Sequence, residues 1–308
     1  AYRIHDRGIS SDDMYGWVQF AKTPDESGYT WVNTLTNDRL EQYALTAAEY
    51  VDGMIFAVDS GKNLLVIDPG LWNRTVITNL GFTVLDMAFD DTTDTMYMVT
   101  RKGGSTYTEL QKLDLTTGEV TMLKNYGYQT RGLYSIAVAD DGTLYATRHS
   151  SANLFVVDKT NFAMTAVKDA SGNTITFTDY TGSTLKPNYS QSMTYDRANN
   201  CLYWAYCTYM AEGFSLYTFD LDTMTYTALK NALGSLTQAD IINMEDGAKR
   251  NEIYEGIAES VAKQAKDIGI DPRTLNVRLG LFGSEGCTVE LREKIEQAWN
   301  LFATDNYC

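Results

Sequence analysis

The sequence is poor in the residues from which most metal sites and disulfide frameworks are built. Its 308 residues include two histidines, His5 and His149, and four cysteines. No cysteine has a partner at the CxxC spacing of a zinc site. Cys201 and Cys207 lie in one expected strand, where about 3.3 Å per residue separates them by roughly 20 Å, too far for a disulfide. We therefore expect no metal, no cofactor and no disulfide framework.

Positive charge and long apolar runs are also scarce. The chain has 25 Lys and Arg against 40 Asp and Glu, a net charge of −15. Binding to nucleic acid or to an anionic membrane needs clustered positive charge, and a membrane-spanning helix needs roughly 18 consecutive apolar residues. We therefore expect no nucleic-acid partner and no membrane insertion. The acidic, tyrosine- and threonine-rich composition favours a secreted or cell-surface protein, with a cytoplasmic protein as the alternative.

What the sequence does have is a fourfold repeat between about residues 11 and 238. In each repeat, an apolar stretch ends at an aspartate, a second carries an aromatic residue, a third ends at another aspartate, and a fourth follows a short turn. The first aspartates are Asp52, Asp90, Asp140 and Asp196, the aromatic residues are Phe56, Tyr97, Tyr145 and Tyr203, and the second aspartates are Asp68, Asp114, Asp158 and Asp220. The aromatic positions recur after 41, 48 and 58 residues, near the length of a four-stranded propeller blade.

Local patterns within the repeats favour strands. VDG, DDG and TTGE supply glycine or aspartate where a turn needs positive φ, and YTELQKLDL and TMYMVT alternate polar with apolar residues. We predict a mainly β protein: a β-propeller of about five four-stranded blades over residues 1–240, with six blades or a β-sandwich as alternatives. A fifth blade would combine MYGWVQF and GYTWVNTL with the stretch SLTQADIINM at residues 235–244.

The strand order of a propeller divides the loops between two faces. One face is acidic, and turn capping is the simplest role for its side chains. These acidic residues are Asp52, Asp68, Asp90, Asp91, Asp94, Asp114, Glu119, Asp140, Asp141, Asp158, Asp196, Asp220 and Asp222. The other face collects cations and tyrosines, which are enriched where proteins bind partners. The candidate ligand-binding residues on this face are Arg101, Lys102, Tyr126, Tyr128, Arg131, Arg148, His149, Tyr189 and Tyr209.

The motifs of common catalytic sites are missing from the repeats. There is no GxSxG turn for a serine nucleophile and no DxDxDG calcium loop. The repeats resemble bacterial extracellular β-propeller modules. The missing catalytic motifs and the face of cations and tyrosines favour a non-catalytic role in binding a glycan, an anionic small molecule or a protein partner. The alternatives are a propeller hydrolase or lyase, and a structural spacer within a larger surface protein.

The pattern changes after about residue 240. Ile253, Ile257, Val261, Ala265 and Ile268 follow helical spacing, LNVRLGLFG is typical of a strand, and VELREKIEQAW is typical of a second helix. We expect a small α/β segment over residues 241–308. A fused or chimeric gene product would show the same change, with its junction between about residues 238 and 257. The stretch MEDGAKRNEIYEG, which lies in this window, also fits a turn and strand of a fifth blade.

Residues 257–307 carry the motifs FGSEG and ATDNY. With their spacing, this stretch resembles the middle of phenylacetate–CoA ligases, which belong to the adenylate-forming enzymes. The resemblance implies that six residues lie near a nucleotide: Gly283, Ser284, Glu285, Asp305, Asn306 and Tyr307. It does not imply activity, because the phosphate loop and the lid with its catalytic lysine are absent, and Cys308 stands where the family has glycine.

Overall fold

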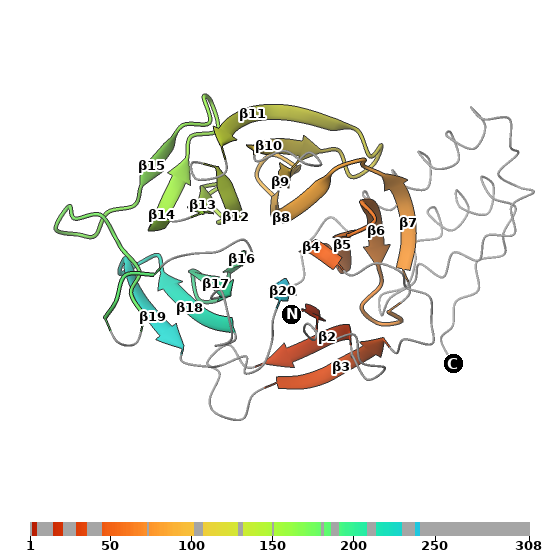
Figure 1. The fold of residues 1–308 in the computed structure, drawn as a ribbon, viewed down its shortest axis with the longest axis horizontal. Helices are drawn as coiled ribbons and strands as arrows, with labels where there is room; N and C mark the ends of the chain where they lie inside the picture. The colour runs from red at the N-terminus through yellow and green to blue at the C-terminus, as the bar shows by residue number, and fades with distance from the viewer. Residues whose placement is uncertain are drawn as a thin grey trace, which may run out of the picture.

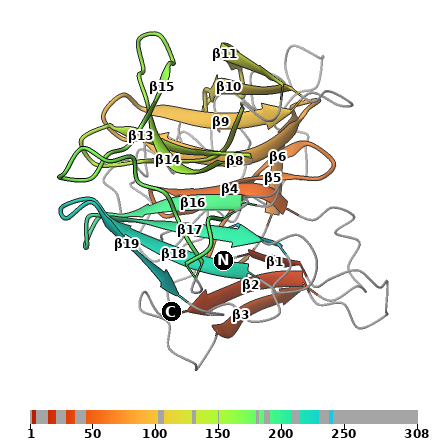
Figure 2. The ribbon, with the colours of Figure 1, turned by 60° about the vertical axis from the view of Figure 1, so that its left-hand side comes forward.

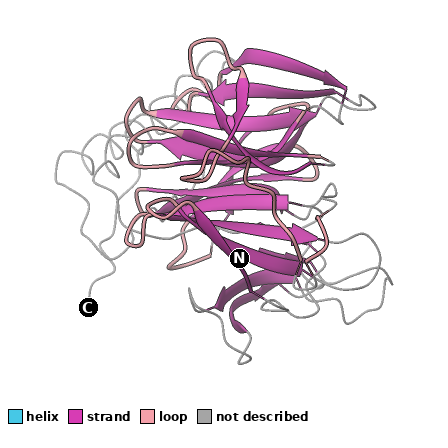
Figure 3. Ribbon diagram, turned by 90° about the vertical axis from the view of Figure 1, so that its left-hand side faces the viewer, coloured by secondary structure: helices cyan, strands magenta, loops and turns pink. Residues whose placement is uncertain are grey.

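The structure is a computed structural model. It describes residues 2–4, 15–20, 29–35, 45–72, 74–101, 107–128, 132–149, 151–179, 182–185, 191–207, 214–229 and 238–240. All regular secondary structure in these ranges is β-strand (Figure 3). The expected α/β segment over residues 241–308 and the ligase-like stretch 257–307 lie outside the described residues.

Four sheets are each built from four strands that follow one another along the chain (Figure 1). The first contains β4 (Leu45–Val51), β5 (Met54–Asp59), β6 (Asn63–Ile67) and β7 (Arg74–Asn79). The second contains β8 (Thr83–Asp90), β9 (Thr95–Arg101), β10 (Tyr107–Leu113) and β11 (Val120–Tyr128). The third contains β12 (Leu133–Val138), β13 (Leu144–Arg148), β14 (Ser151–Val157) and β15 (Met164–Ala166). The fourth contains β16 (Gln191–Asp196), β17 (Cys201–Cys207), β18 (Phe214–Asp220) and β19 (Thr225–Leu229).

A further sheet joins the two ends of the described chain. Its order is β20 (Gln238–Asp240), β1 (Tyr2–Ile4), β2 (Tyr15–Phe20) and β3 (Tyr29–Leu35). The stretch 235–244 was expected to pair with an N-terminal strand, and Gln238 does pair with Ile4. Strand β1 was not expected from the sequence, because the repeat was expected to begin only near residue 11.

The four sheets of consecutive strands are arranged as blades around a common centre (Figures 1 and 2). The innermost strands β4, β8, β12 and β16 contact one another in that order. The prediction of a mainly β propeller is confirmed for these four blades. The aromatic residues that defined the repeat all lie on the second strand of a blade and are buried: Phe56, Tyr97, Tyr145 and Tyr203. Phe56, Tyr97 and Tyr145 each lie in a hydrophobic cluster with residues of the next blade, which explains why an aromatic residue recurs at this position.

The turns are formed by the aspartate and glycine residues that the repeat pattern placed there. Between β4 and β5, Asp52 and Gly53 have φ of 49° and 89°, the conformation of a two-residue hairpin turn. The turn after each third strand begins with an aspartate whose Oδ1 accepts the backbone N–H two residues later. The four bonds join Gly70 to Asp68 (2.7 Å), Thr116 to Asp114 (2.8 Å), Thr160 to Asp158 (2.7 Å) and Asp222 to Asp220 (2.9 Å). The turn-capping interpretation of these aspartates is confirmed.

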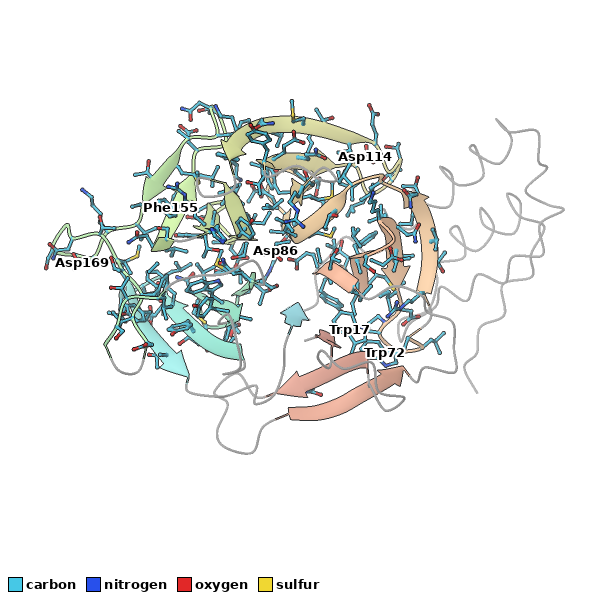
Figure 4. All side chains as sticks on the ribbon, in the orientation of Figure 1. Trp17, Trp72, Asp86, Asp114, Phe155 and Asp169 are labelled. Atoms are coloured by element: carbon cyan, nitrogen blue, oxygen red, sulfur yellow. The ribbon has the colours of Figure 1, made fainter. Side chains whose placement is uncertain are left out.

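Asp86 joins three blades near the centre of the molecule (Figure 4). Its side chain is fully buried in β8. The carboxylate accepts the backbone N–H of Ile136 from β12 at 2.9 Å and that of Met193 from β16 at 3.2 Å. The Ser192 hydroxyl donates to it at 3.3 Å. A buried carboxylate needs such donors, and they hold the inner strands in register with one another.

The long third repeat has a structural cause. After β15 the chain makes two further narrow hairpins, with bridges between Lys168 and Thr174 and between Thr178 and Thr184. Phe177, from the second hairpin, is buried with its ring centroid 4.9 Å from that of Trp204. This insertion fills the space between the third and fourth blades and accounts for the 58-residue spacing.

Candidate functional site

The strand register shows which charged residues share one end of the blades. Arg101 lies opposite Thr83, and Arg148 lies opposite Leu133. Thr83 and Leu133 begin the inner strands β8 and β12 of neighbouring blades. We call this end, with Arg101, Arg148 and His149, the basic end. The opposite end, where Asp52, Asp90, Asp140 and Asp196 lie at or just after the ends of the inner strands, is the acidic end.

Aromatic rings lie close to Arg148, which ends β13, and to His149, which follows it. The Arg148 guanidinium carbon lies 5.2 Å from the centroid of the Phe155 ring, a distance at which the ring attracts a cation. The His149 ring lies 5.4 Å from that of Tyr134, which is buried. Burial lowers the pKa of His149, so its imidazole is neutral at pH 7. The pair thus presents one fixed cation beside one neutral ring.

A buried network of hydrogen-bonded polar side chains lies next to Arg148. The hydroxyls of Ser135 and Thr147 share a hydrogen bond. Thr147 donates to Gln191 Oε1 at 2.7 Å, and Trp204 Nε1 donates to the same oxygen at 3.2 Å. Thr147 directly precedes Arg148, so the network fixes the backbone that carries the guanidinium. The sequence did not indicate it, because its members come from four different strands.

Tyr126 takes part in a contact between blades. Its hydroxyl donates to the carbonyl oxygen of Phe162 at 2.9 Å, and burial raises its pKa. Tyr128 ends β11, but its side chain is outside the described residues. Other predicted site residues also lie outside them: Lys102, Arg131, Tyr189 and Tyr209, which the sequence assigned to the face of cations and tyrosines, and Gly283, Ser284, Glu285, Asp305, Asn306 and Tyr307, in the ligase-like stretch.

The acidic end has a small pocket at the centre, which was not expected from the sequence. Residues of four blades line it, and its volume of about 40 Å³ is enough for little more than a water molecule. Glu49 lies in this pocket. Burial raises the pKa of Glu49 to about 8, although a hydrogen bond from the Tyr50 N–H and the nearby charge of Arg197 lower it.

Ion pairs at the acidic end join turns of different blades. Arg197, in the turn after β16, pairs with Asp91 after β8 and with Asp140 after β12. Lys159, in the turn after β14, pairs with Asp90 at 2.5 Å. Burial alone would raise the pKa of Asp90, but the hydrogen bonds from Lys159 and from two threonines lower it. Much of the acidic charge at this end therefore serves the contacts between blades.

Metal binding and membrane crossing have no support among the residues that the structure describes. Within them, no group of three or more His, Cys, Asp and Glu side chains could hold a metal ion. The described ranges also contain no helix long and apolar enough to cross a membrane.

Comparisons with known proteins leave the family open. No protein-family model matches the chain, so the resemblance of residues 257–307 to the ligases has no support from that search. No curated protein matches either.

Solved structures show a distant similarity. TolB from Acinetobacter baumannii is 12% identical, with a TM-score of 0.45 over 74% of this chain and 52% of that one. A protein of unknown function from Bacteroides thetaiotaomicron is 15% identical, with a TM-score of 0.43 over 66% of this chain and 52% of the other. The extracellular domain of a putative hybrid two-component system from the same organism is 15% identical, with a TM-score of 0.42 over 75% of this chain and 30% of the other. The matched part thus spans about half of two of these chains and under a third of the other. Neither the fold nor the function of this protein rests on similarities at this level.

Proposed function

We propose that this protein is a non-catalytic binding propeller that takes an anionic ligand at the basic end. The observation that carries the proposal is the shared position of Arg101 and Arg148, which end the second strands of neighbouring blades at the same end of the molecule. Loops and strand ends on a rigid scaffold are the usual place for a binding site. The carboxylates at the other end are largely engaged in turns and in contacts between blades.

The geometry around Arg148 favours a carboxylate-bearing small molecule or an acidic sugar. A guanidinium is planar and binds a carboxylate through two parallel hydrogen bonds. Contact with the Phe155 ring holds that plane, so less side-chain freedom is lost on binding. The neutral His149 ring beside it can accept or donate a hydrogen bond. Neutral glycans and protein partners remain alternative ligands.

An enzymatic role at the same end, as a hydrolase or lyase, is the second candidate function. A test for product formation separates the two candidate functions, because only an enzyme converts the molecule that it binds. A structural spacer would neither bind nor convert a ligand.

We also propose that the sheet of β20, β1, β2 and β3 is a fifth blade that closes the propeller over residues 1–240. β20 contacts the inner strands β4 and β16 of the two flanking blades. The ring of Trp72, beside the first blade, lies 5.7 Å from that of Trp17 on β2. Limited proteolysis tests the boundary: a stable fragment that ends near residue 240 supports it, and protection through to Asn306 contradicts it. We place the protein at the cell surface or outside the cell on its acidic, tyrosine-rich composition.

A glycan array that contains uronic-acid, sialylated and neutral oligosaccharides tests the ligand with the full chain. Isothermal titration calorimetry then gives the affinity of any acidic sugar that binds. We expect the double variant Arg101→Gln, Arg148→Gln to weaken binding about tenfold or more, since hydrogen bonds to charged groups contribute roughly 1.5–3 kcal/mol each. Lys168→Gln removes an exposed cation from the outer hairpin and should leave the affinity unchanged. Equal affinity of the double variant and the natural protein would exclude the basic end as the site.

A further inference from the structure

A second pocket lies at the acidic end of the second blade, away from both Arg148 and the central pocket. Its volume is about 490 Å³, within the roughly 300–1,000 Å³ range of small-molecule sites. It lies between the turn after β8 and the turn after β10, and Asp114 marks the second of these in Figure 4. We call it the blade-two groove. Its lining includes Phe89, Leu113 and Leu115, of which the two leucines are buried and Phe89 is partly exposed.

Polar side chains of both charges surround these apolar residues. Lys112 and the carboxylates of Asp94, Asp114 and Glu119 line the groove together with four threonines. The threonines are Thr93, Thr95, Thr116 and Thr121. Together these groups offer hydrogen-bond donors and acceptors around an aromatic ring, within one blade.

Two of these charged side chains have no partner among the residues that the structure describes. Within the described part of the chain, the side chains of Lys112 and Glu119 make no hydrogen bond or ion pair, whereas Lys159 and Arg197 at the same end are both paired. Lys112 and Glu119 line one pocket without pairing with each other. Each is therefore available to a ligand.

We infer that the blade-two groove binds an uncharged saccharide of one or two rings. Carboxylates accept hydrogen bonds from sugar hydroxyls, the Lys112 ammonium donates them, and threonine does both. The Phe89 ring offers an apolar surface for the C–H face of a sugar ring. Three carboxylates against one ammonium disfavour an anion, and the described residues contain no cluster that could hold a metal ion. An uncharged, hydroxyl-rich molecule offers hydrogen-bond partners to the carboxylates, to the ammonium and to the threonines alike.

Saturation-transfer NMR with the full chain tests this inference. The probes are the methyl glycosides of glucose, galactose, mannose and xylose, together with maltose, cellobiose and lactose, at millimolar concentration. Isothermal titration calorimetry on the strongest binder then compares variants. Glu119→Gln and Thr121→Val change exposed side chains of the groove, so both should fold. We expect each to weaken binding several-fold, and the double variant tenfold or more.

The matched control is Thr165→Val, which changes an exposed threonine on β15, the outer strand of the neighbouring blade. It should leave the affinity unchanged. No saturation transfer to any of the probes, or an affinity that the double variant retains, overturns the inference. The double variant Arg101→Gln, Arg148→Gln separates the two sites: it should leave saccharide binding in the groove intact even if binding at the basic end is lost or never observed.

Discussion

Replacing Glu49 by glutamine should flatten the pH dependence of stability. Glu49 lies in the central pocket at the acidic end, together with Asp52, Asp91 and Arg197. Its pKa rises from 4.5 to about 8, first because of burial. The folded protein therefore keeps a proton that the unfolded chain releases across this range. The free energy of unfolding should fall as pH rises from about 4.5 to 8, and the Glu49 contribution should be constant above that range.

The size of this effect follows from the pKa difference. The two pKa values of Glu49 differ by about 3.5, and each pKa unit corresponds to about 1.4 kcal/mol. The change in the free energy of unfolding therefore has an upper bound of about 5 kcal/mol. The side chain of Glu49 is only partly buried, so solvent screens part of this energy. We expect about 2–3 kcal/mol between pH 5 and pH 8.5. Glutamine keeps the shape and stays neutral, so the variant lacks this contribution.

Urea denaturation of the full chain, followed by tryptophan fluorescence at several pH values from 5 to 8.5, measures the effect. The stability of Glu49→Gln relative to the natural protein should increase with pH. Thr165→Val changes an exposed side chain that does not titrate and serves as the control, whose difference from the natural protein should change little with pH. Parallel pH profiles for Glu49→Gln and the natural protein would refute the reasoning, because they would show that Glu49 titrates alike in the folded and unfolded chains.

Three further substitutions test the contacts between blades, each by urea denaturation at pH 7. Gly132→Ala should cost about 2–3 kcal/mol or more, because the new Cβ would overlap the hydroxyl oxygen of the buried Thr108; an unchanged midpoint would mean that the blades can move apart there. Phe177→Ala should cost about 3–5 kcal/mol, because this fully buried ring fills the space between the third and fourth blades; a loss below about 1 kcal/mol would show that the inserted hairpins do not belong to the core. Asp86→Ala should cost about 2–5 kcal/mol, because it leaves two buried backbone N–H groups of neighbouring blades without their acceptor; a neutral result would mean that water replaces the carboxylate.

Features that depend on neighbours along the chain were predictable. The bond from the Thr116 N–H to Asp114 spans two residues, and the Asp52-Gly53 turn needs only a tight hairpin. Because such interactions are local, their residue types repeat wherever the local structure repeats. The aromatic residue of each second strand recurs for a similar reason, since every blade must fill the same kind of space against its neighbour.

The candidate sites were only partly predictable. Arg101 and Arg148 could be assigned to one face, because a strand-by-strand count tells which end of a blade a residue occupies. The hydrogen bond from the Tyr126 hydroxyl to the Phe162 carbonyl could not be predicted, because the two residues lie 36 residues apart and meet only when one blade packs on the next. The blade-two groove was not predicted, because nothing in the sequence distinguishes Glu119 from the many other acidic residues in turns.

The repeated pattern of strands and capped turns was already sufficient to indicate a mainly β propeller, because each blade is held together by pairing between strands adjacent along the chain. The pattern could not indicate which buried polar groups join the blades. Asp86 reaches partners 50 and 107 residues away, and Arg197 brings together turns of three blades. Such contacts exist only once the blades surround a common centre, since that arrangement alone brings distant residues within hydrogen-bond distance and removes them from water. The same arrangement raises the pKa of Glu49, which in the sequence is an ordinary glutamate within a strand.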